Sequence, residues 1–149
     1  MIRPDINSVR NFWENNPLFQ GESINPVGTD DYFRNHSKLY IKDCFGGKLD
    51  KHLFPSTISD GDVLDLGCGP GFWVEQFDKY KPNSIFAIDL TEKALELTKK
   101  RCQYLGIDLK KKNITIKKGN AENLEFEDNS FDHVNCQGVV HHTPNTKLA

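Results

Sequence analysis

The chain has 149 residues, of which 37% are hydrophobic and 27% charged, and its formal net charge at pH 7 is -2. This composition excludes disordered and fibrous classes and fits one globular domain with a small appendage. The chain lacks the excess of basic residues that is typical of nucleic-acid-binding proteins. No apolar stretch approaches the length of a membrane span. No Cys-x-x-Cys pair and no signal-peptide pattern occur, so we expect free thiols, no metal site and a cytoplasmic location.

A first short helix is predicted close to the N-terminus. Asn7 or Ser8 can cap it, and Asn16-Pro17 should end it, because a residue before proline avoids the helical region. Its apolar side carries Val9, Phe12 and Trp13. We expect no strand in residues 1–55, which differ in this respect from residues 56–149.

A second helix is predicted after the proline-containing loop between Gly21 and Gly28. Thr29 or Asp30 can cap this helix, and Gly46-Gly47 should stop it. Its apolar positions recur at a spacing of three to four residues, at Phe33, His36, Tyr40 and Cys44.

The remaining chain alternates strands and helices, which predicts an α/β fold with a parallel sheet. The predicted strands cover residues 63–66, 84–89, 114–117 and 131–136. One predicted helix, 72–80, should bury Phe72, Trp73, Phe77 and Tyr80. The other, 92–105, has Thr91 as its N-cap and should bury Leu95, Thr98, Cys102 and Leu105.

The run from Val63 to Gly71, VLDLGCGPG, reads as a strand that leads into a glycine-rich cofactor loop. Glycines allow unusual backbone dihedral angles and let a ligand approach the main chain. A dinucleotide fingerprint is G-x-G-x-x-G, but here the third glycine comes one position early. Pro70 also withdraws an N–H that a pyrophosphate would use, so a cofactor without phosphate fits this loop better.

Asp89 follows the next predicted strand, 22 residues after Gly67. An acid at this place binds ribose hydroxyls in Rossmann sites. The same side chain can also cap the helix that starts near Thr91, and the two roles are compatible.

Four segments in order resemble the motifs of class I S-adenosylmethionine-dependent methyltransferases, especially small-molecule enzymes of the ubiquinone-biosynthesis type. They are Val63–Gly71, Ile85–Arg101 (IFAIDLTEKALELTKKR), Gly119–Phe126 (GNAENLEF) and Asn129–Asn145 (NSFDHVNCQGVVHHTPN). The resemblance covers about residues 62–145 and implies a Rossmann-like three-layer αβα domain at residues 56–149. It implies a helical lid over the cofactor at residues 1–55, where Trp13, Tyr32, Phe33, His36 and Tyr40 could wall off the substrate.

The resemblance implies S-adenosyl-L-methionine as cofactor and assigns ten positions to it. The methionine part would meet Asp65, Gly67, Cys68, Gly69, Gly71 and Gln137. The ribose and adenine would meet Asp89, Leu90, Asn120 and Ala121. The family usually has aspartate at the position of Asn120, although an amide oxygen can still accept a hydrogen bond.

The implied reaction is in-line methyl transfer to a small-molecule acceptor. His141 and His142 lie where the family loop reaches the reaction centre, and with Tyr40 they are the catalytic candidates. The alternative is that these three side chains are structural.

The family core has seven strands ordered 3-2-1-4-5-7-6, and this chain supplies the first four, in the order 3-2-1-4. We therefore expect a fragment that binds the cofactor weakly and exposes a sheet edge through which it could oligomerise. The fourth strand also carries His133 and Asn135, which is unexpected in a buried parallel strand. Two alternatives stay open, namely a non-catalytic cofactor-binding subunit and a nicotinamide-dependent oxidoreductase on a similar fold.

Overall fold

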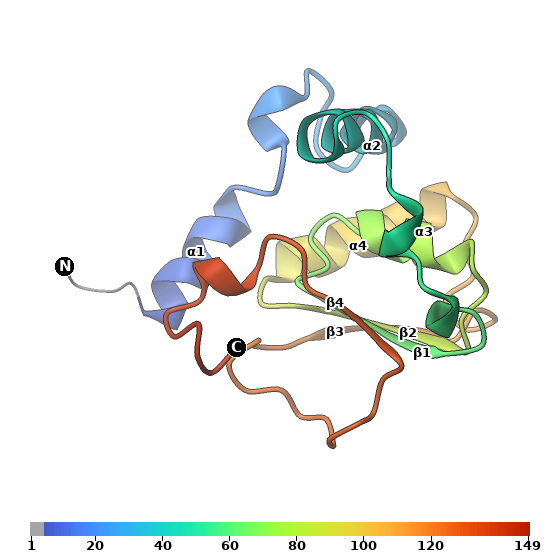
Figure 1. Cartoon of the computed structure of the whole chain (residues 1–149). Coiled ribbons are helices and arrows are strands. Elements are labelled where there is room, and N and C mark those ends of the chain that lie inside the picture. Colours follow the sequence, from blue (N-terminus) through green and yellow to red (C-terminus); the bar gives the residue numbers. More distant parts are fainter. Residues whose placement is uncertain (1–4) are drawn as a thin grey trace.

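The computed structural model describes residues 5–149 and contains a four-stranded parallel sheet with the order β3-β2-β1-β4 (Figure 1). The strands are β1 (Asp62–Leu66), β2 (Ser84–Asp89), β3 (Ile114–Lys118) and β4 (His133–Asn135). The predicted α/β class and strand order are confirmed. Strand β4 is shorter than the predicted span, 131–136.

Helices α3 (Phe72–Asp78) and α4 (Glu92–Tyr104) lie on the same face of the sheet (Figure 1). Both belong to crossovers that step in the same direction, and right-handed crossovers in one direction place their helices on one face. The step from β3 to β4 reverses direction, and its connecting segment covers the other face with Phe126 and Phe131.

The helix caps follow local chemistry. The hydroxyl of Thr91 accepts a hydrogen bond from the amide of Ala94 and caps α4, as predicted. The buried positions Phe72, Trp73, Phe77, Leu95, Thr98 and Cys102 are also confirmed. Tyr80 and Leu105 are each 38% exposed, contrary to prediction, because α3 and α4 both end before them.

The N-terminal part of the chain forms two helices, α1 (Ile6–Asn15) and α2 (Asp30–Phe45). Asp5, and not the predicted Asn7 or Ser8, caps α1, because its carboxylate accepts the amide of Ser8 at 2.8 Å. The predicted limits of α2 are confirmed, with Thr29 at its start and left-handed Gly46 at its end.

Two predicted apolar positions in these helices are exposed. Phe12 is 56% exposed, since the inward side of α1 carries Ile6, Val9 and Trp13 instead. Cys44 is exposed on α2, whereas Tyr32, Phe33, His36 and Tyr40 are buried. Helix α2 lies above α3 and α4, on the side away from the sheet (Figure 1). Short 3-10 turns cover Gln20–Glu22, Lys51–Leu53, Ser56–Ile58 and Val140–His142.

The polar residues of β4 have partners in the structure. Asn135 is buried, and its amide nitrogen donates to Asp65 Oδ1 at 2.7 Å, between adjacent strands. The His133 ring meets the edge of Phe77 with ring centroids 5.3 Å apart. A polar pair and an aromatic contact thus account for the unusual composition of this strand.

The described residues contain no group of His, Cys, Asp and Glu side chains that could hold a metal ion, and all four cysteines are free. Over the same part of the chain, no helix has both the length and the apolar character of a membrane span.

Candidate functional site

A cavity lies at the carboxyl ends of the strands, which is where open parallel sheets bind ligands. Four segments that follow strands line it, and α1 and its connecting loop close it from the N-terminal side. The sheet side contributes Gly67, Gly69, Pro70, Ile88, Asp89, Leu90, Thr91, Gly119, Asn120 and Ala121. The loop after β4 contributes Gln137, Gly138, Val139, His142 and Thr143.

The three glycines of the loop have positive φ angles but different surroundings. A Cβ on Gly67 (φ +76°) would lie 2.2 Å from Val139 Cγ2, so the loop after β4 touches bare backbone there. A Cβ on Gly69 (φ +50°) would meet no atom within 4 Å. Gly71 (φ +79°) faces the backbone of Thr98 in α4 and does not line the cavity. Gly69 therefore presents open main chain to a ligand, Gly67 allows the close approach of the loop after β4, and Gly71 allows close helix packing.

Asp89 lines the cavity and holds two elements together. Its Oδ2 accepts the amide of Gly69 at 3.0 Å. Its Oδ1 accepts the amide of Thr91 at 3.0 Å and the Thr91 hydroxyl at 2.8 Å. Burial raises the pKa of this carboxyl, and the hydrogen bonds from Thr91 and Gly69 act in the opposite direction. Asp89 thus fixes both the glycine loop and the start of α4.

Asn120 and Ala121 form the cavity wall beyond β3. The side-chain oxygen of Asn120 accepts the amide of Glu122 at 3.1 Å, which makes a local turn. That oxygen has a second lone pair, so the turn does not remove its ability to accept another hydrogen bond.

Asp65 and Cys68 lie behind the cavity and not on its surface. Asp65 is fully buried, and its Oδ2 has no hydrogen-bond partner among the described residues. Burial raises the pKa of Asp65 to about 7. Cys68 is also buried, with its sulfur 3.5 Å from the hydroxyl of Thr98, and burial raises its pKa.

Of the three catalytic candidates, the structure places one at the cavity. His142 lines it and meets Trp13 edge-on, with ring centroids 5.0 Å apart. Burial lowers the pKa of His142, and His141 contributes in the same direction. His141 is exposed outside the cavity lining, and Tyr40 is buried against Phe72 with ring centroids 4.7 Å apart.

Helix α1 covers the cavity with Ile6, Val9 and Trp13 and is attached to α4. Both carboxylate oxygens of Glu14 accept backbone amides of the first turn of α4, from Glu92 and Lys93, each at 3.0 Å. The sequence prediction missed Ile6 and Glu14, and it also missed Leu18, which lines the cavity after α1. The spacing of Ile6, Val9 and Trp13 carries the signal for this face of α1.

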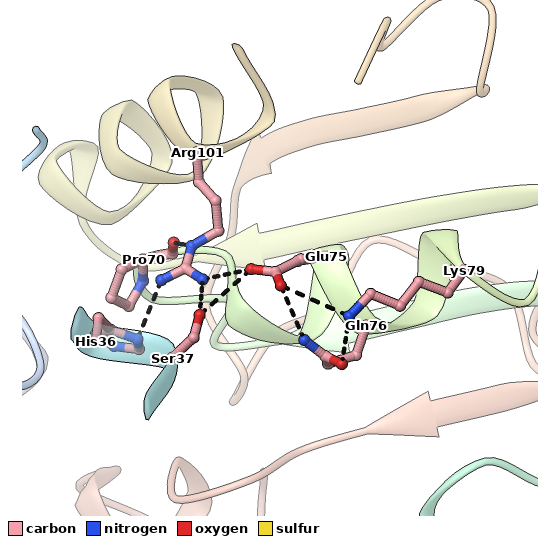
Figure 2. A network of polar contacts seen from close by, with 7 residues as sticks. All are labelled: His36, Ser37, Pro70, Glu75, Gln76, Lys79 and Arg101. Atoms are coloured by element: carbon pink, nitrogen blue, oxygen red, sulfur yellow. Dashed lines mark hydrogen bonds and ion pairs between the residues drawn. The ribbon is translucent and has the colours of Figure 1, made fainter. Parts of the chain in front are cut away.

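Sequence reasoning also missed Arg101, whose guanidinium contacts the glycine loop at Pro70 (Figure 2). Its side chain is 1% exposed, and its Nε donates to the carbonyl of Pro70 at 2.7 Å. The other guanidinium nitrogens bind His36 and Ser37 of α2 and Glu75 of α3. In the sequence, Arg101 looks like any helical cation, because its partners are distant.

The cavity suits S-adenosylmethionine in its chemistry. Asp89 offers a carboxylate at the end of β2, where a ribose is bound in related sheets. Leu90, Ala94 and Ala121 offer apolar contact for a flat adenine ring. Gly69 leaves room beside the main chain, and Trp13 and Val9 line the cavity with apolar side chains from α1.

Comparison with known proteins agrees with this geometry. The sequence pattern of a family described as a methyltransferase domain matches residues 63–149. The chain is 32% identical over 87 residues to YcgJ, an uncharacterized methyltransferase of Bacillus subtilis, which covers 58% of this chain and 32% of that protein. It is 34% identical over 127 residues to the demethylmenaquinone methyltransferase of Lactococcus lactis, and the aligned region covers 83% of this chain and 48% of that protein.

The crystal structure of Bacillus subtilis YcgJ superposes with a TM-score of 0.54 at 29% identity, over 60% of this chain and 36% of that one. The chain thus spans less than half the length of these curated relatives. The family pattern nevertheless covers more than half of the chain and includes the strands and loops that build the cavity. The chain therefore belongs to the class I methyltransferases, whose cofactor is S-adenosylmethionine.

Proposed function

We propose that this chain supplies the cofactor-binding half of an enzyme that transfers a methyl group from S-adenosylmethionine to a small-molecule acceptor. The observation that carries the proposal is the convergence of three segments that follow β1, β2 and β3 on one cavity, with Asp89 at its centre. In this proposal residues 1–55 act as a lid segment and residues 56–149 as the cofactor-binding domain.

Each lining residue has a proposed contact with the cofactor. Asp89 binds the ribose hydroxyls, and Leu90 lies against the adenine. Asn120 and Ala121 meet the adenine edge, since they form the wall beyond β3. Gly67, Gly69 and Gln137 accommodate the methionine part. Asp65, Cys68 and Gly71 do not line the cavity, and their proposed role is to stabilise the conformation of the loop.

The cofactor supplies a methyl group on a positively charged sulfur, which is reactive without further activation. The chain's own residues have to orient the acceptor and keep water out, and orientation of this kind contributes up to about 7–11 kcal/mol in favourable cases. Trp13 and His142 form a contact across the cavity mouth and are placed to do this. We assign His142 to acceptor orientation or proton transfer, and this role replaces the wider set of His141, His142 and Tyr40.

The small size of the acceptor is supported by the cover of the cavity. Ile6, Val9 and Trp13 close it with apolar groups, which suits a small organic molecule with apolar parts. The related Lactococcus lactis enzyme is named for a demethylated menaquinone, which is consistent with such an acceptor.

Isothermal titration of the chain with S-adenosylhomocysteine tests the proposal. We expect saturable binding to the wild type, binding that is at least about tenfold weaker in Asp89→Asn, and no binding of NAD. Asp43→Asn, at an exposed site on α2, is the matched control and should bind like the wild type. Binding of NAD in preference to S-adenosylhomocysteine would overturn the proposal in favour of an oxidoreductase.

A further inference from the structure

We propose that Arg101 is a positioning residue that makes the shape of the cofactor loop depend on the docking of helix α2. The inference rests on the proposed function, because it concerns the same cavity. Helix α2 contributes no residue to the cavity lining. It is nevertheless connected by hydrogen bonds to two of the segments that line the cavity.

The first tie runs through the guanidinium of Arg101 (Figure 2). Its Nη2 lies 3.0 Å from Nδ1 of His36, and its Nη1 donates to the hydroxyl of Ser37 at 2.8 Å. Its Nε donates to the carbonyl of Pro70 inside the loop. One rigid, planar group therefore spans from α2 to the main chain of the cofactor loop, which a lysine could not do.

The charge of Arg101 is balanced inside this contact. Glu75 of α3 accepts a 2.7 Å hydrogen bond from Nη1, and Arg101 also lies over the ring of Phe33, 5.0 Å from its centroid. Because a guanidinium only donates, His36 must accept at Nδ1 and carry its proton on Nε2. That Nε2 is buried without a hydrogen-bond partner among the described residues. The His36 ring thus accepts the hydrogen bond from Arg101, while its own Nε2–H group stays without a partner among the described residues.

A second side chain of α4 acts beside Arg101. Thr98 lies one turn earlier, and its hydroxyl donates to the carbonyl of Gly69 at 2.9 Å. Two successive loop carbonyls, those of Gly69 and Pro70, thus accept hydrogen bonds from side chains of α4. Of these two contacts only the one from Arg101 continues to α2, so Arg101 is a polar link between the loop and that helix, beside the apolar packing of Tyr40 on Phe72.

The second contact of α2 reaches the loop after α1 that lines the cavity. The hydroxyl of Tyr32 donates to the carbonyl of Leu18 at 3.1 Å, and Leu18 lines the cavity. Phe19 packs edge-on against His36, with ring centroids 5.5 Å apart. Docking of α2 therefore sets the cofactor loop through Arg101 and the loop after α1 through Tyr32. A ligand that fixes the loop should in turn hold α2 in place.

Hydrogen exchange measured by mass spectrometry tests this coupling. In the wild type, S-adenosylhomocysteine should slow amide exchange in α2, although α2 does not line the cavity. In Arg101→Lys this protection should disappear, and binding should weaken about tenfold. Ser37→Ala removes the contacts of the Ser37 hydroxyl with Arg101 and Glu75 but keeps the contact between Arg101 and His36, and it should lose part of the protection. Lys99→Met removes a neighbouring exposed charge of α4 and should behave like the wild type.

The outcomes separate this inference from the proposed function. If S-adenosylhomocysteine does not bind the wild type, the proposed function fails. If it binds but leaves exchange in α2 unchanged, or if Arg101→Lys keeps the protection, only the coupling is refuted. Arg101→Met combined with Glu75→Gln avoids leaving the partly buried Glu75 carboxylate without its arginine partner and should reproduce the loss seen in Arg101→Lys.

Discussion

The backbone amide of Gly69 donates a 3.0 Å hydrogen bond to the carboxylate of Asp89, which joins the loop after β1 to the end of β2. The same carboxylate accepts two hydrogen bonds from Thr91. Asp89 therefore reaches the cavity in one fixed orientation, because its neighbours on both sides use its oxygens. Asp89 fixes the start of α4, and its carboxylate lies at the cavity, where the proposed contact with the ribose would be made.

Thr91→Val should separate these roles. The change removes the hydroxyl that binds Asp89 and caps α4 but keeps the side-chain volume. We expect a loss of about 1–2 kcal/mol in the free energy of unfolding. Binding of S-adenosylhomocysteine should weaken less than in Asp89→Asn, because the carboxylate stays. Urea denaturation and calorimetry measure the two effects, and an unchanged urea midpoint would contradict the capping role.

Two glycine substitutions in one loop should differ in their effect on stability. Gly69→Ala adds a methyl group in open space and should cost about 1–2 kcal/mol, from the positive φ alone. Gly67→Ala adds one against Val139 and should cost ~3 kcal/mol or more. Thermal unfolding shows the difference. Val139→Ala introduced together with Gly67→Ala should recover part of the loss, and failure to do so would place the strain elsewhere.

Asp65 should make the protein less stable as the pH rises towards neutrality. Its pKa is raised from 3.8 to about 7 in the folded state. Below pH 3.8 the carboxyl is neutral in both states, and its contribution to stability is then complete. Between 3.8 and 7 the unfolded chain releases the proton first, so this contribution is lost as the pH rises.

The comparison of wild type with Asp65→Asn measures this effect. The variant should gain stability relative to the wild type between pH 4 and pH 7 in urea titrations. The difference between the two proteins is the relevant quantity, because His36 gives an opposite slope to both. Burial lowers the pKa of His36 from 6.5 to about 3, so its contribution is present above 6.5 and is lost as the pH falls towards 3. A difference that does not change with pH would refute the prediction.

Glu14→Gln should loosen the lid. The carboxylate lies at the first turn of α4, where negative charge is stabilised by the helix dipole. Loss of the charge should cost about 0.5–1 kcal/mol and increase the exposure of Trp13, because both residues lie on α1. Acrylamide quenching of tryptophan fluorescence reports this exposure. Glu96→Gln, on the exposed side of α4, is the control and should leave the quenching unchanged.

The strands, the glycine loop and the cap at Thr91 could be predicted because each depends on residues close in sequence. The burial of Arg101 could not be predicted in this way. Its partner His36 lies 65 positions away, and only the docked position of α2 reveals that the two side chains are buried together. The first helix shows a second limit: Asp5, Asn7 and Ser8 are all good caps, and the packing of Ile6 over the cavity decides among them.

The polar composition of β4 has the same explanation. Asn135 finds its partner Asp65 at a sequence separation of 70, in a neighbouring strand. No local pattern indicates such a pair, so an apparently unsuitable strand residue was in fact half of a buried contact.

The position of β4 beside β1 bears on how the nascent chain matures. β1 is made early, but its neighbour on one side arrives only when residues 133–135 have been synthesised. Until then the side chain of Asp65 lacks the hydrogen bond from Asn135. Once β4 docks, Asn135 covers the same carboxylate. The buried pair of Asp65 and Asn135 is therefore completed only when β4 has been made and has paired with β1.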